Sequence, residues 1–393
     1  MKYSILFISA ITAFALNVSG QESINSVLSG IEKNNPLLQA ARTETDAEKI
    51  GNTTGLYPGN PEAGFNYLWG NPDIIGNRRD FSIVQSFDFP SAYHYRSNVA
   101  RLRNDKAELV FQDKRKQLLY EAYNICSELI YRNALNRLLS ERLDNAGALA
   151  RVYKRRFETG DANIMESNKA QINLLSVTKQ YEMNEISRND LISRLTSLNG
   201  GREVVLSDTL FPVISINTDF EKWYAEISAS NPALNILKQE VLITQKEKQL
   251  NSSLRLPQFS AGYMSEVIPG EEFKGVIVGM SIPLWQNKNT VKYAKARTLA
   301  AAKVEEGNRQ AFYNSMKAGH TRVLALRDKV NEYREVIGSL NNTALLRKAL
   351  DSGQISLSEY LIELAYYYDA YNQLLEMEYE LQRAYSEISR YQL

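Results

Sequence analysis

Apolar and polar residues alternate along several short segments of the chain. From Asp80 to Phe89, most odd-numbered positions are apolar, and from Gly275 to Ile282 the even-numbered positions are apolar. The positions between them are largely small or polar. A shorter alternating run precedes each of these, at Phe65–Trp69 and at Phe259–Tyr263. A period of two is typical of a strand with one apolar face. The pattern therefore predicts four strands.

Turn-forming residues separate each shorter run from the longer run that follows it. They lie around Gly70-Asn71-Pro72 in the first case and around Ile268-Pro269-Gly270 in the second. Glycine, proline and asparagine favour chain reversals, so the four strands are expected to form two hairpins. On the two longer strands the predicted apolar face consists of Phe81, Ile83, Phe87, Phe89, Val276, Val278, Met280 and Ile282.

The apolar period becomes helical after Pro90 and after Pro283. No proline occurs in 91–211 or in 284–393, so proline interrupts no helix in either stretch. The last helix has two apolar stripes, which indicates that it packs against neighbours on both sides. The first stripe is Leu357, Leu361, Leu364, Tyr368, Tyr371 and Leu375, and the second is Leu374, Met377, Leu381, Ala384, Ile388 and Tyr391.

A helix from about Ser91 to the turn at Gly160 would be ~100 Å long at 1.5 Å per residue, even with a loosened turn at Gly147. A compact globule of this chain length would be only ~55 Å across. The sequence therefore predicts an elongated molecule, with the hairpins and the glycine turns at opposite ends of the helices.

The chain aligns with itself, which predicts an internal duplication. The segment 158–166 matches 351–359, and Pro90 and Pro283 share the same offset, while Asn35-Pro36 matches Asn231-Pro232. Chance similarity between two helical segments is the alternative. The predicted division is a signal peptide at 1–20, a first structural repeat at 21–200, a linker at 201–218 and a second repeat at 219–393.

The N-terminus has the features of an export signal. Lys2 precedes an apolar run from Ile5 to Leu16, and small residues lie just before Gln21, where cleavage is expected. An uncleaved anchor is the alternative, although this run is shorter than the ~20 residues that span a bilayer. No cysteine follows directly, so an N-terminal lipid anchor is not expected.

Composition excludes several classes of protein. With 46 Lys and Arg against 45 Asp and Glu, the net charge of +1 lacks the basic excess of a nucleic-acid binder. Two histidines and one cysteine do not suffice for a structural zinc site or a disulfide framework. Cys126 is interpreted as a packed core thiol rather than a reactive one. His94, which lies between two tyrosines, is interpreted as part of an interfacial aromatic belt rather than a metal site.

Four strands cannot close a membrane barrel, so closure requires several copies of the chain. An exported chain with a tandem repeat, two hairpins that each lead into a long helical pair, and a glycine turn followed by a carboxylate resembles the TolC family of outer-membrane efflux channels. The resemblance covers the mature chain. It implies a mainly α protein with a membrane β-barrel: a homotrimer in which long helical hairpins form an α-barrel tunnel through the periplasm and four strands per chain complete a twelve-stranded β-barrel in the outer membrane.

The resemblance also implies functional positions near the glycine turns. Glu359 would line the tunnel constriction together with Glu363; the alternative is that Glu359 is an ordinary solvated residue. The chain departs from the expected pattern at Ile355 and Ile362, where an arginine and a second acid are expected. The predicted periplasmic tip, where an adaptor docks, comprises Arg155, Arg156, Gly160, Glu166, Arg347 and Gly353.

The leading hypothesis is a passive exit duct for a tripartite efflux or type I secretion system. Its partners would be a periplasmic adaptor, or membrane fusion protein, an inner-membrane pump that supplies the energy, and outer-membrane lipid. A periplasmic coiled-coil adaptor or scaffold is the alternative, but it would not need an apolar strand face. No catalytic motif is found, so an enzyme, a cofactor and a metal are not expected.

Overall fold

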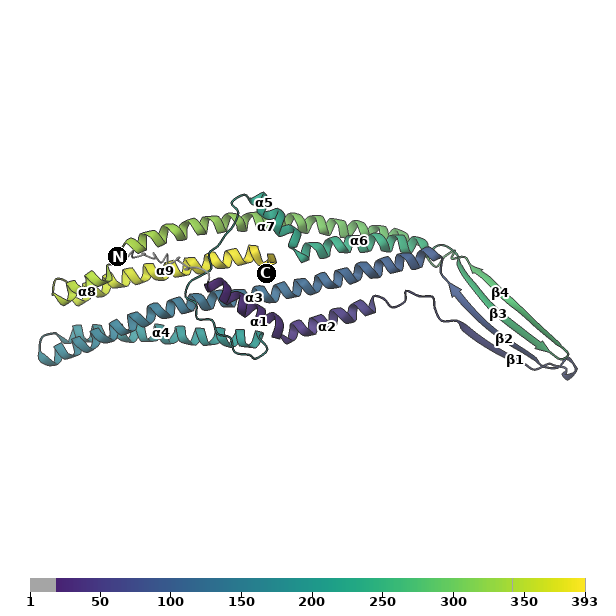
Figure 1. Cartoon of the computed structure of the whole chain (residues 1–393), viewed down its shortest axis with the longest axis horizontal. Helices are drawn as coiled ribbons and strands as arrows, with labels where there is room; N and C mark the ends of the chain where they lie inside the picture. The colour runs from purple at the N-terminus through teal and green to yellow at the C-terminus, as the bar shows by residue number, and fades with distance from the viewer. Residues whose placement is uncertain (1–18, 341, 393) are drawn as a thin grey trace, which may run out of the picture. The chain divides into compact units, whose positions relative to one another are not determined.

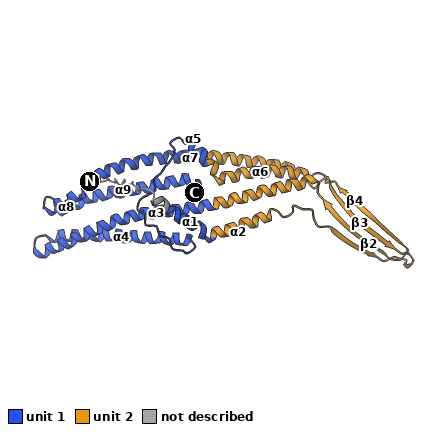
Figure 2. Cartoon of the chain, in the orientation of Figure 1, with its two compact units in different colours: residues 1–36, 115–227, 315–393 blue, residues 37–114, 228–314 orange. Residues whose placement is uncertain are grey.

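The computed structural model describes residues 19–340 and 342–392, with side chains from residue 23 onward. The predicted export signal lies almost wholly outside the described residues. The chain divides into two compact units (Figure 2). Unit 1 contains residues 1–36, 115–227 and 315–393, and unit 2 contains residues 37–114 and 228–314. Each unit draws on both predicted repeats, so this division differs from the repeat boundaries, which stay a prediction.

Unit 2 contains one antiparallel sheet of four strands in the order β1-β2-β3-β4 (Figure 1). The strands are β1 (Glu62–Leu68), β2 (Arg78–Phe87), β3 (Gln258–Ile268) and β4 (Glu271–Ser281). The two predicted hairpins are confirmed, and β2 and β3 join them into one sheet. Within the described residues, β1 and β4 each pair on one side only.

Two predicted strand residues, Phe89 and Ile282, lie just beyond the strands. β2 ends at Phe87 because helix α3 begins at Pro90, whose fixed φ suits the first helical position. The Phe89 ring still contacts the sheet, 6.4 Å from that of Phe259. In the first turn, a short 3-10 helix, η1 (Asp73–Ile75), lengthens the connection between β1 and β2.

The register places most of the apolar side chains of the four strands on one face. Ile83 lies opposite Ala63 on one side and Tyr263 on the other, and Tyr263 in turn lies opposite Val276. A parallel row runs through Phe87, Phe259 and Met280. Since alternate residues share a face, the opposite face carries residues such as Ser82, Ser86, Gly262, Gly275 and Gly279.

The helices of unit 2 are held together by ion pairs. Helix α2 (Pro36–Gly51) lies on α3, where Glu108 pairs with Arg42 at 2.9 Å and with Lys49. Helix α6 (Pro232–Ser253) is joined to α3 and to α7 through Glu247, which pairs with Arg103 at 2.8 Å and with Arg297 at 3.1 Å. Polar contacts between helices thus fix much of this packing.

Two helices are long, as predicted. Helix α3 (Pro90–Thr159) has 70 residues, which is ~105 Å of helix, and it is continuous through Gly147. Helix α7 (Thr290–Ser339) has 50 residues and is followed by the separate short helix α8 (Thr343–Asp351). None of the described helices is apolar over a stretch long enough to cross a membrane.

Unit 1 contains the parts of α3 and α7 from residues 115 and 315 onward, together with several further helices. They are α1 (Ser19–Asn34), α4 (Ile164–Leu198), α5 (Phe220–Ser230), α8 and α9 (Leu357–Ser389), with the short η2 (Arg390–Gln392) at the end. Their largest core joins α1, α3 and α4 around Ile31, Leu129 and Leu195, which are fully buried. Cys126 lies in this core, as predicted, and burial raises the pKa of its thiol to about 12.

The two Asn-Pro pairs both start a helix. Pro36 is the first residue of α2 and Pro232 the first of α6, and each preceding asparagine is almost fully buried. The Asn231 side chain accepts hydrogen bonds from the backbone of Ala233 and Leu234, so it caps α6. Asn35 instead donates from Nδ2 to the carbonyl of Leu198, 2.8 Å away, which ties the start of α2 to the end of α4.

Candidate functional site

The two glycine turns lie at the same end of unit 1, where α3 leads into α4 and α8 into α9 (Figure 1). Gly160 has φ +82° and Gly353 has φ +74°, so both adopt a left-handed conformation. Each helix closes with a bond between residues five positions apart: Asp161 N donates to Arg156 O at 2.7 Å, and Gln354 N donates to Ala349 O at 2.9 Å. This is the pattern of a glycine-terminated helix.

The carboxylates after the turns belong to matching capping boxes. In the α4 box, the Asn163 side chain accepts from Glu166 N at 2.9 Å, and Asn163 N donates to Glu166 Oε2 at 3.1 Å. In the α9 box, Ser356 Oγ accepts from Glu359 N at 3.2 Å, and Ser356 N donates to Glu359 Oε2 at 2.8 Å. The fixed spacing from glycine to glutamate therefore has a local structural cause.

Glu359 is exposed, and its bond from the Ser356 backbone holds the pKa of its carboxyl below the ordinary value of 4.5. Glu363 is also exposed and lies one helical turn further along the same face of α9. The two acids thus form a charged edge beside the turn. The pattern Ser-x-x-Glu before an apolar run is the sequence signal for this capping role.

The three predicted tip arginines differ in their surroundings. Arg155 and Arg156 are exposed near the end of α3, and the Arg156 guanidinium lies 5.5 Å from the ring centre of Tyr153. Arg347 lies in the short helix α8, where its Nε is 3.1 Å from the Asp351 carboxylate. Its Nη1 donates to Asn145 Oδ1 at 3.2 Å.

Asn145 is a connecting residue that sequence reasoning missed. It accepts from Arg347 and donates from Nδ2 to the hydroxyl of Tyr360, 3.0 Å away, so it links α3 to both α8 and α9. Beside it, Lys169 Nζ of α4 donates to Ser358 Oγ at 2.8 Å. These bonds surround a small core that includes Tyr360, which is 1% exposed. Asparagine inside a long helix has no distinctive sequence signal, so only the structure could identify it.

The predicted lipid-facing strand residues form the second candidate surface. On β4, Val276 and Val278 are each 82% exposed, and Met280 is 59% exposed. Phe81, Ile83 and Phe87 of β2 are less exposed because strands pair on both sides of them. Aromatic side chains lie at the turn end of the same surface, where the Tyr67 and Trp69 rings meet edge to face at 5.4 Å.

His94 lies near the start of α3, and its Nε2 is 2.9 Å from Asn98 Nδ2. Its ring meets Tyr95 edge to face at 5.4 Å. In the part of the chain that the structure describes, no group of three or more His, Cys, Asp or Glu side chains is arranged to hold a metal ion.

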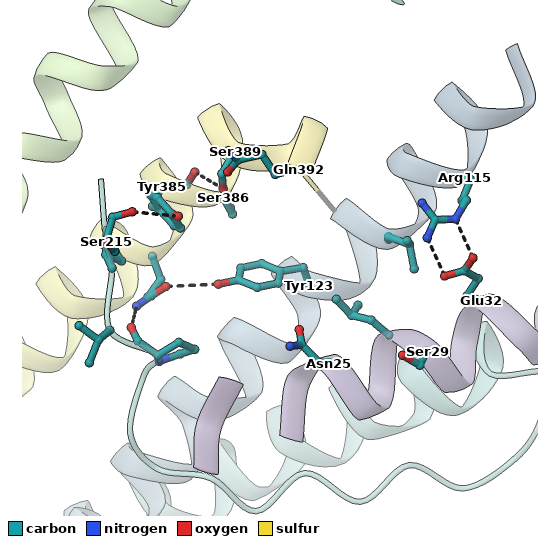
Figure 3. A pocket seen from close by; sticks show the side chains of 16 residues that line it. Asn25, Ser29, Glu32, Arg115, Tyr123, Ser215, Tyr385, Ser386, Ser389 and Gln392 are labelled. Carbon is teal, nitrogen blue, oxygen red and sulfur yellow. Dashed lines mark hydrogen bonds and ion pairs between the residues drawn. The ribbon is translucent and has the colours of Figure 1, made fainter. Parts of the chain in front are cut away.

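A cavity of about 680 Å³ lies in unit 1 between α1, α3, the 212–215 segment and the end of α9 (Figure 3). Its polar side chains bind one another. Arg115 Nε donates to Glu32 at 2.7 Å, which holds the pKa of that carboxyl below its ordinary value. Gln382 donates to the carbonyl of Pro212 at 2.7 Å, and Tyr123 donates to Gln382 at 3.4 Å. These contacts tie the linker segment to the helices.

No protein-family model matches the sequence, and no curated protein matches it either. Its fold, however, is found among solved outer-membrane channels. The Campylobacter jejuni CmeC outer-membrane channel is similar at a TM-score of 0.74 with 14% identity, over 100% of this chain and 92% of that one. The outer-membrane channel OprN is similar at 0.75 with 13% identity, over 94% and 89%. VceC, an outer-membrane protein of Vibrio cholerae, is similar at 0.72 with 10% identity, over 96% and 98%.

The chain therefore has the fold of TolC-like outer-membrane channels: long helices with one small antiparallel sheet. The similarity extends over nearly the full length of those proteins. The fold expected from the sequence resemblance is confirmed at this level.

Proposed function

We propose that this chain forms a passive exit duct in the outer membrane, through which an inner-membrane pump exports its cargo with the help of a periplasmic adaptor. The fold similarity to outer-membrane channels supports this proposal. The observation that supports it most strongly is the apolar face of the sheet. Exposed valine, isoleucine and phenylalanine side chains on three neighbouring strands suit contact with lipid.

The duct would be a homotrimer. β1 and β4 have a free edge in the described chain, and an open edge is not tolerated in lipid. Pairing of β4 with β1 of the next copy would satisfy both edges, and three copies of four strands would complete a twelve-stranded barrel. The strands have 7 to 11 residues, which is close to the 9–11 residues that span a bilayer in a tilted barrel.

The internal duplication belongs to the same proposal. Two matching capping boxes, two left-handed glycines and two Asn-Pro helix starts in the same order support a duplicated unit. The interruption between α7 and α8, which α3 lacks, would then be a later difference between the copies.

The glycine turns would form the periplasmic tip. Three copies of Glu359 and Glu363 around a three-fold axis would give rings of carboxylates that favour cations. Exposed Arg155 and Arg156, with the Gly160 and Gly353 turns, would offer the surface on which the adaptor docks. Glu359 would cap α9 and face the tunnel at the same time, because the capping bond engages only one of its carboxylate oxygens.

Membrane fractionation of cells that express the full chain tests the proposal. The chain should be recovered with outer membranes and run in mild detergent as a trimer that heating converts to monomer. A monomer in the periplasmic fraction would contradict the duct and favour the adaptor or scaffold hypothesis.

A further inference from the structure

The 680 Å³ cavity of unit 1 leaves no charge of its lining without a partner. Its sixteen lining side chains include one acid, Glu32, and one base, Arg115. Arg115 Nε donates to Glu32 Oε1 at 2.7 Å and its Nη2 donates to Oε2 at 2.8 Å, so the two groups form a two-pronged ion pair. The other polar side chains of the lining carry only amide or hydroxyl groups. A charged ligand would therefore meet no unpaired group of opposite charge.

The buried polar side chains of the lining are bonded within the chain. Gln382, which is 3% exposed, donates to Pro212 O at 2.7 Å and accepts from the Tyr123 hydroxyl at 3.4 Å. Ser389 Oγ donates to Tyr385 O at 2.8 Å. These bonds join α3, the linker segment and the end of α9, so they fix the wall of the cavity rather than offer groups to a ligand.

Four exposed side chains supply the polar groups that a ligand can reach. They are Asn25 and Ser29 of α1, Ser215 of the linker segment and Gln392 of η2. Figure 3 shows Tyr123 in the middle of the cavity, with the α1 residues on one side of it and the residues from the end of α9 and η2 on the other. Each amide and each hydroxyl can both donate and accept hydrogen bonds. The reachable groups thus suit a ligand whose own polar groups do both.

The lining also has an apolar part, formed by Leu28, Leu119, Pro212, Val213 and Ile214. Leu28 and Leu119 are buried, and Val213 is 73% exposed. A small-molecule pocket typically combines such apolar surface with a few polar groups that fix the orientation of the ligand, and the volume of this cavity lies in the range of such pockets.

We propose that this cavity binds a neutral sugar, as a mono- or disaccharide. Every sugar hydroxyl both donates and accepts, which matches the amides of Asn25 and Gln392 and the hydroxyls of Ser29 and Ser215. The C–H groups of the sugar ring would lie against Val213. A carboxylate cannot donate to the amide oxygens and an ammonium group cannot accept from the amide NH2 groups, and either would bring an unpaired charge into the cavity.

Ligand-observed NMR with the purified full-length chain tests this proposal. The detergent must have no sugar headgroup, because an alkyl maltoside would compete for the cavity. The probes are glucose, galactose, mannose and N-acetylglucosamine, each compared with its uronic acid or amino-sugar counterpart at about pH 6, where those counterparts are charged. At least one neutral sugar should bind saturably with one site per chain. Its charged counterpart should bind at least about tenfold more weakly, which corresponds to the loss of one hydrogen bond of ordinary strength.

Ser29→Trp should block the cavity from the α1 side and abolish sugar binding. Ser26→Trp is the matched control, since Ser26 is an exposed serine of the same helix outside the lining, and it should leave binding intact. Gln392→Leu removes an exposed amide and should weaken binding about tenfold without lowering the thermal unfolding temperature.

Absence of binding by every neutral sugar, or equal binding of neutral and charged forms, would overturn the proposal. Binding that survives both Ser29→Trp and Gln392→Leu would place the sugar elsewhere and overturn it as well. Equal unfolding temperatures of Ser29→Trp and Ser26→Trp show that a loss of binding comes from the blocked cavity; if Ser29→Trp unfolds earlier, Gln392→Leu decides. None of these measurements depends on transport, so the result is independent of whether the chain is an exit duct.

Discussion

Val276→Arg tests the assignment of the lipid-facing surface. Val276 is the sixth of the eleven residues of β4, is 82% exposed, and lies in one row with Tyr263 and Ile83. If the apolar face contacts lipid, this position lies near the middle of the membrane. The neighbouring Ile277 belongs to the opposite face, in a row with Gly262 and Val84, so Ile277→Arg is the matched control.

An arginine on the lipid face near mid-membrane costs about 2–4 kcal/mol, and the same side chain on the lumen face costs little. Both substitutions add one charge to adjacent positions of the same strand, so their effects on strand propensity are alike. The difference between the variants therefore isolates the environment. If the whole cost of the lipid-facing arginine destabilises the assembled state, Val276→Arg should reduce the population of assembled protein roughly 30- to 900-fold.

The assay is the recovery of heat-labile trimer from outer membranes, measured for both variants at equal expression. Val276→Arg should lose the trimer band, and Ile277→Arg should retain most of it. Equal yields would refute the assignment of Val276 to lipid. Loss of the trimer only in Ile277→Arg would show that the two faces are reversed.

Gly353→Ala should destabilise the α8–α9 turn by about 1–2 kcal/mol, because φ is +74° there although space for a Cβ is open, whereas Gly307→Ala inside α7 should stabilise by about 0.5–1 kcal/mol; thermal unfolding of both variants checks this. Glu359→Gln keeps the capping geometry, so any fall in cation selectivity in single-channel recordings reports the charge alone, and unchanged selectivity would make Glu359 an ordinary cap. The lowered pKa of Glu32 means that its bond to Arg115 adds stability above the ordinary pKa of 4.5 and loses it as pH falls through the folded-state pKa. Glu32→Gln should therefore unfold earlier than the native chain at pH 7 and differ less from it at pH 3, and a constant difference would contradict this.

The hairpins and the long helices could be predicted from the sequence because both have a regular period. Alternation over Asp80–Phe89 identified β2 to within two residues at each end, and the proline-free stretch after Ser91 predicted the length of α3. The strand ends were less certain, because Phe89 and Ile282 continue the alternation but lie where the chain leaves the sheet. A strand ends where its backbone stops hydrogen-bonding to the neighbouring strand, and the apolar pattern does not record that point.

In the candidate sites, too, the features with a local cause could be predicted and those that depend on distant residues could not. Left-handed Gly160 and Gly353 follow from local chemistry, since glycine alone adopts that conformation without strain. The network through Asn145 could not be predicted, because its partners Arg347 and Tyr360 are distant in the sequence and meet only when α8 and α9 pack on α3.

The sequence by itself therefore determined the elements whose causes are local: the period of each strand and helix, the caps and the glycine turns. Tertiary structure decided the rest. The joining of the two hairpins through β2 and β3, the alignment of their apolar residues on one face, and the cavity around Tyr123 all depend on contacts between distant segments. Such contacts arise from the burial and pairing of whole elements, so no local pattern of residues records them.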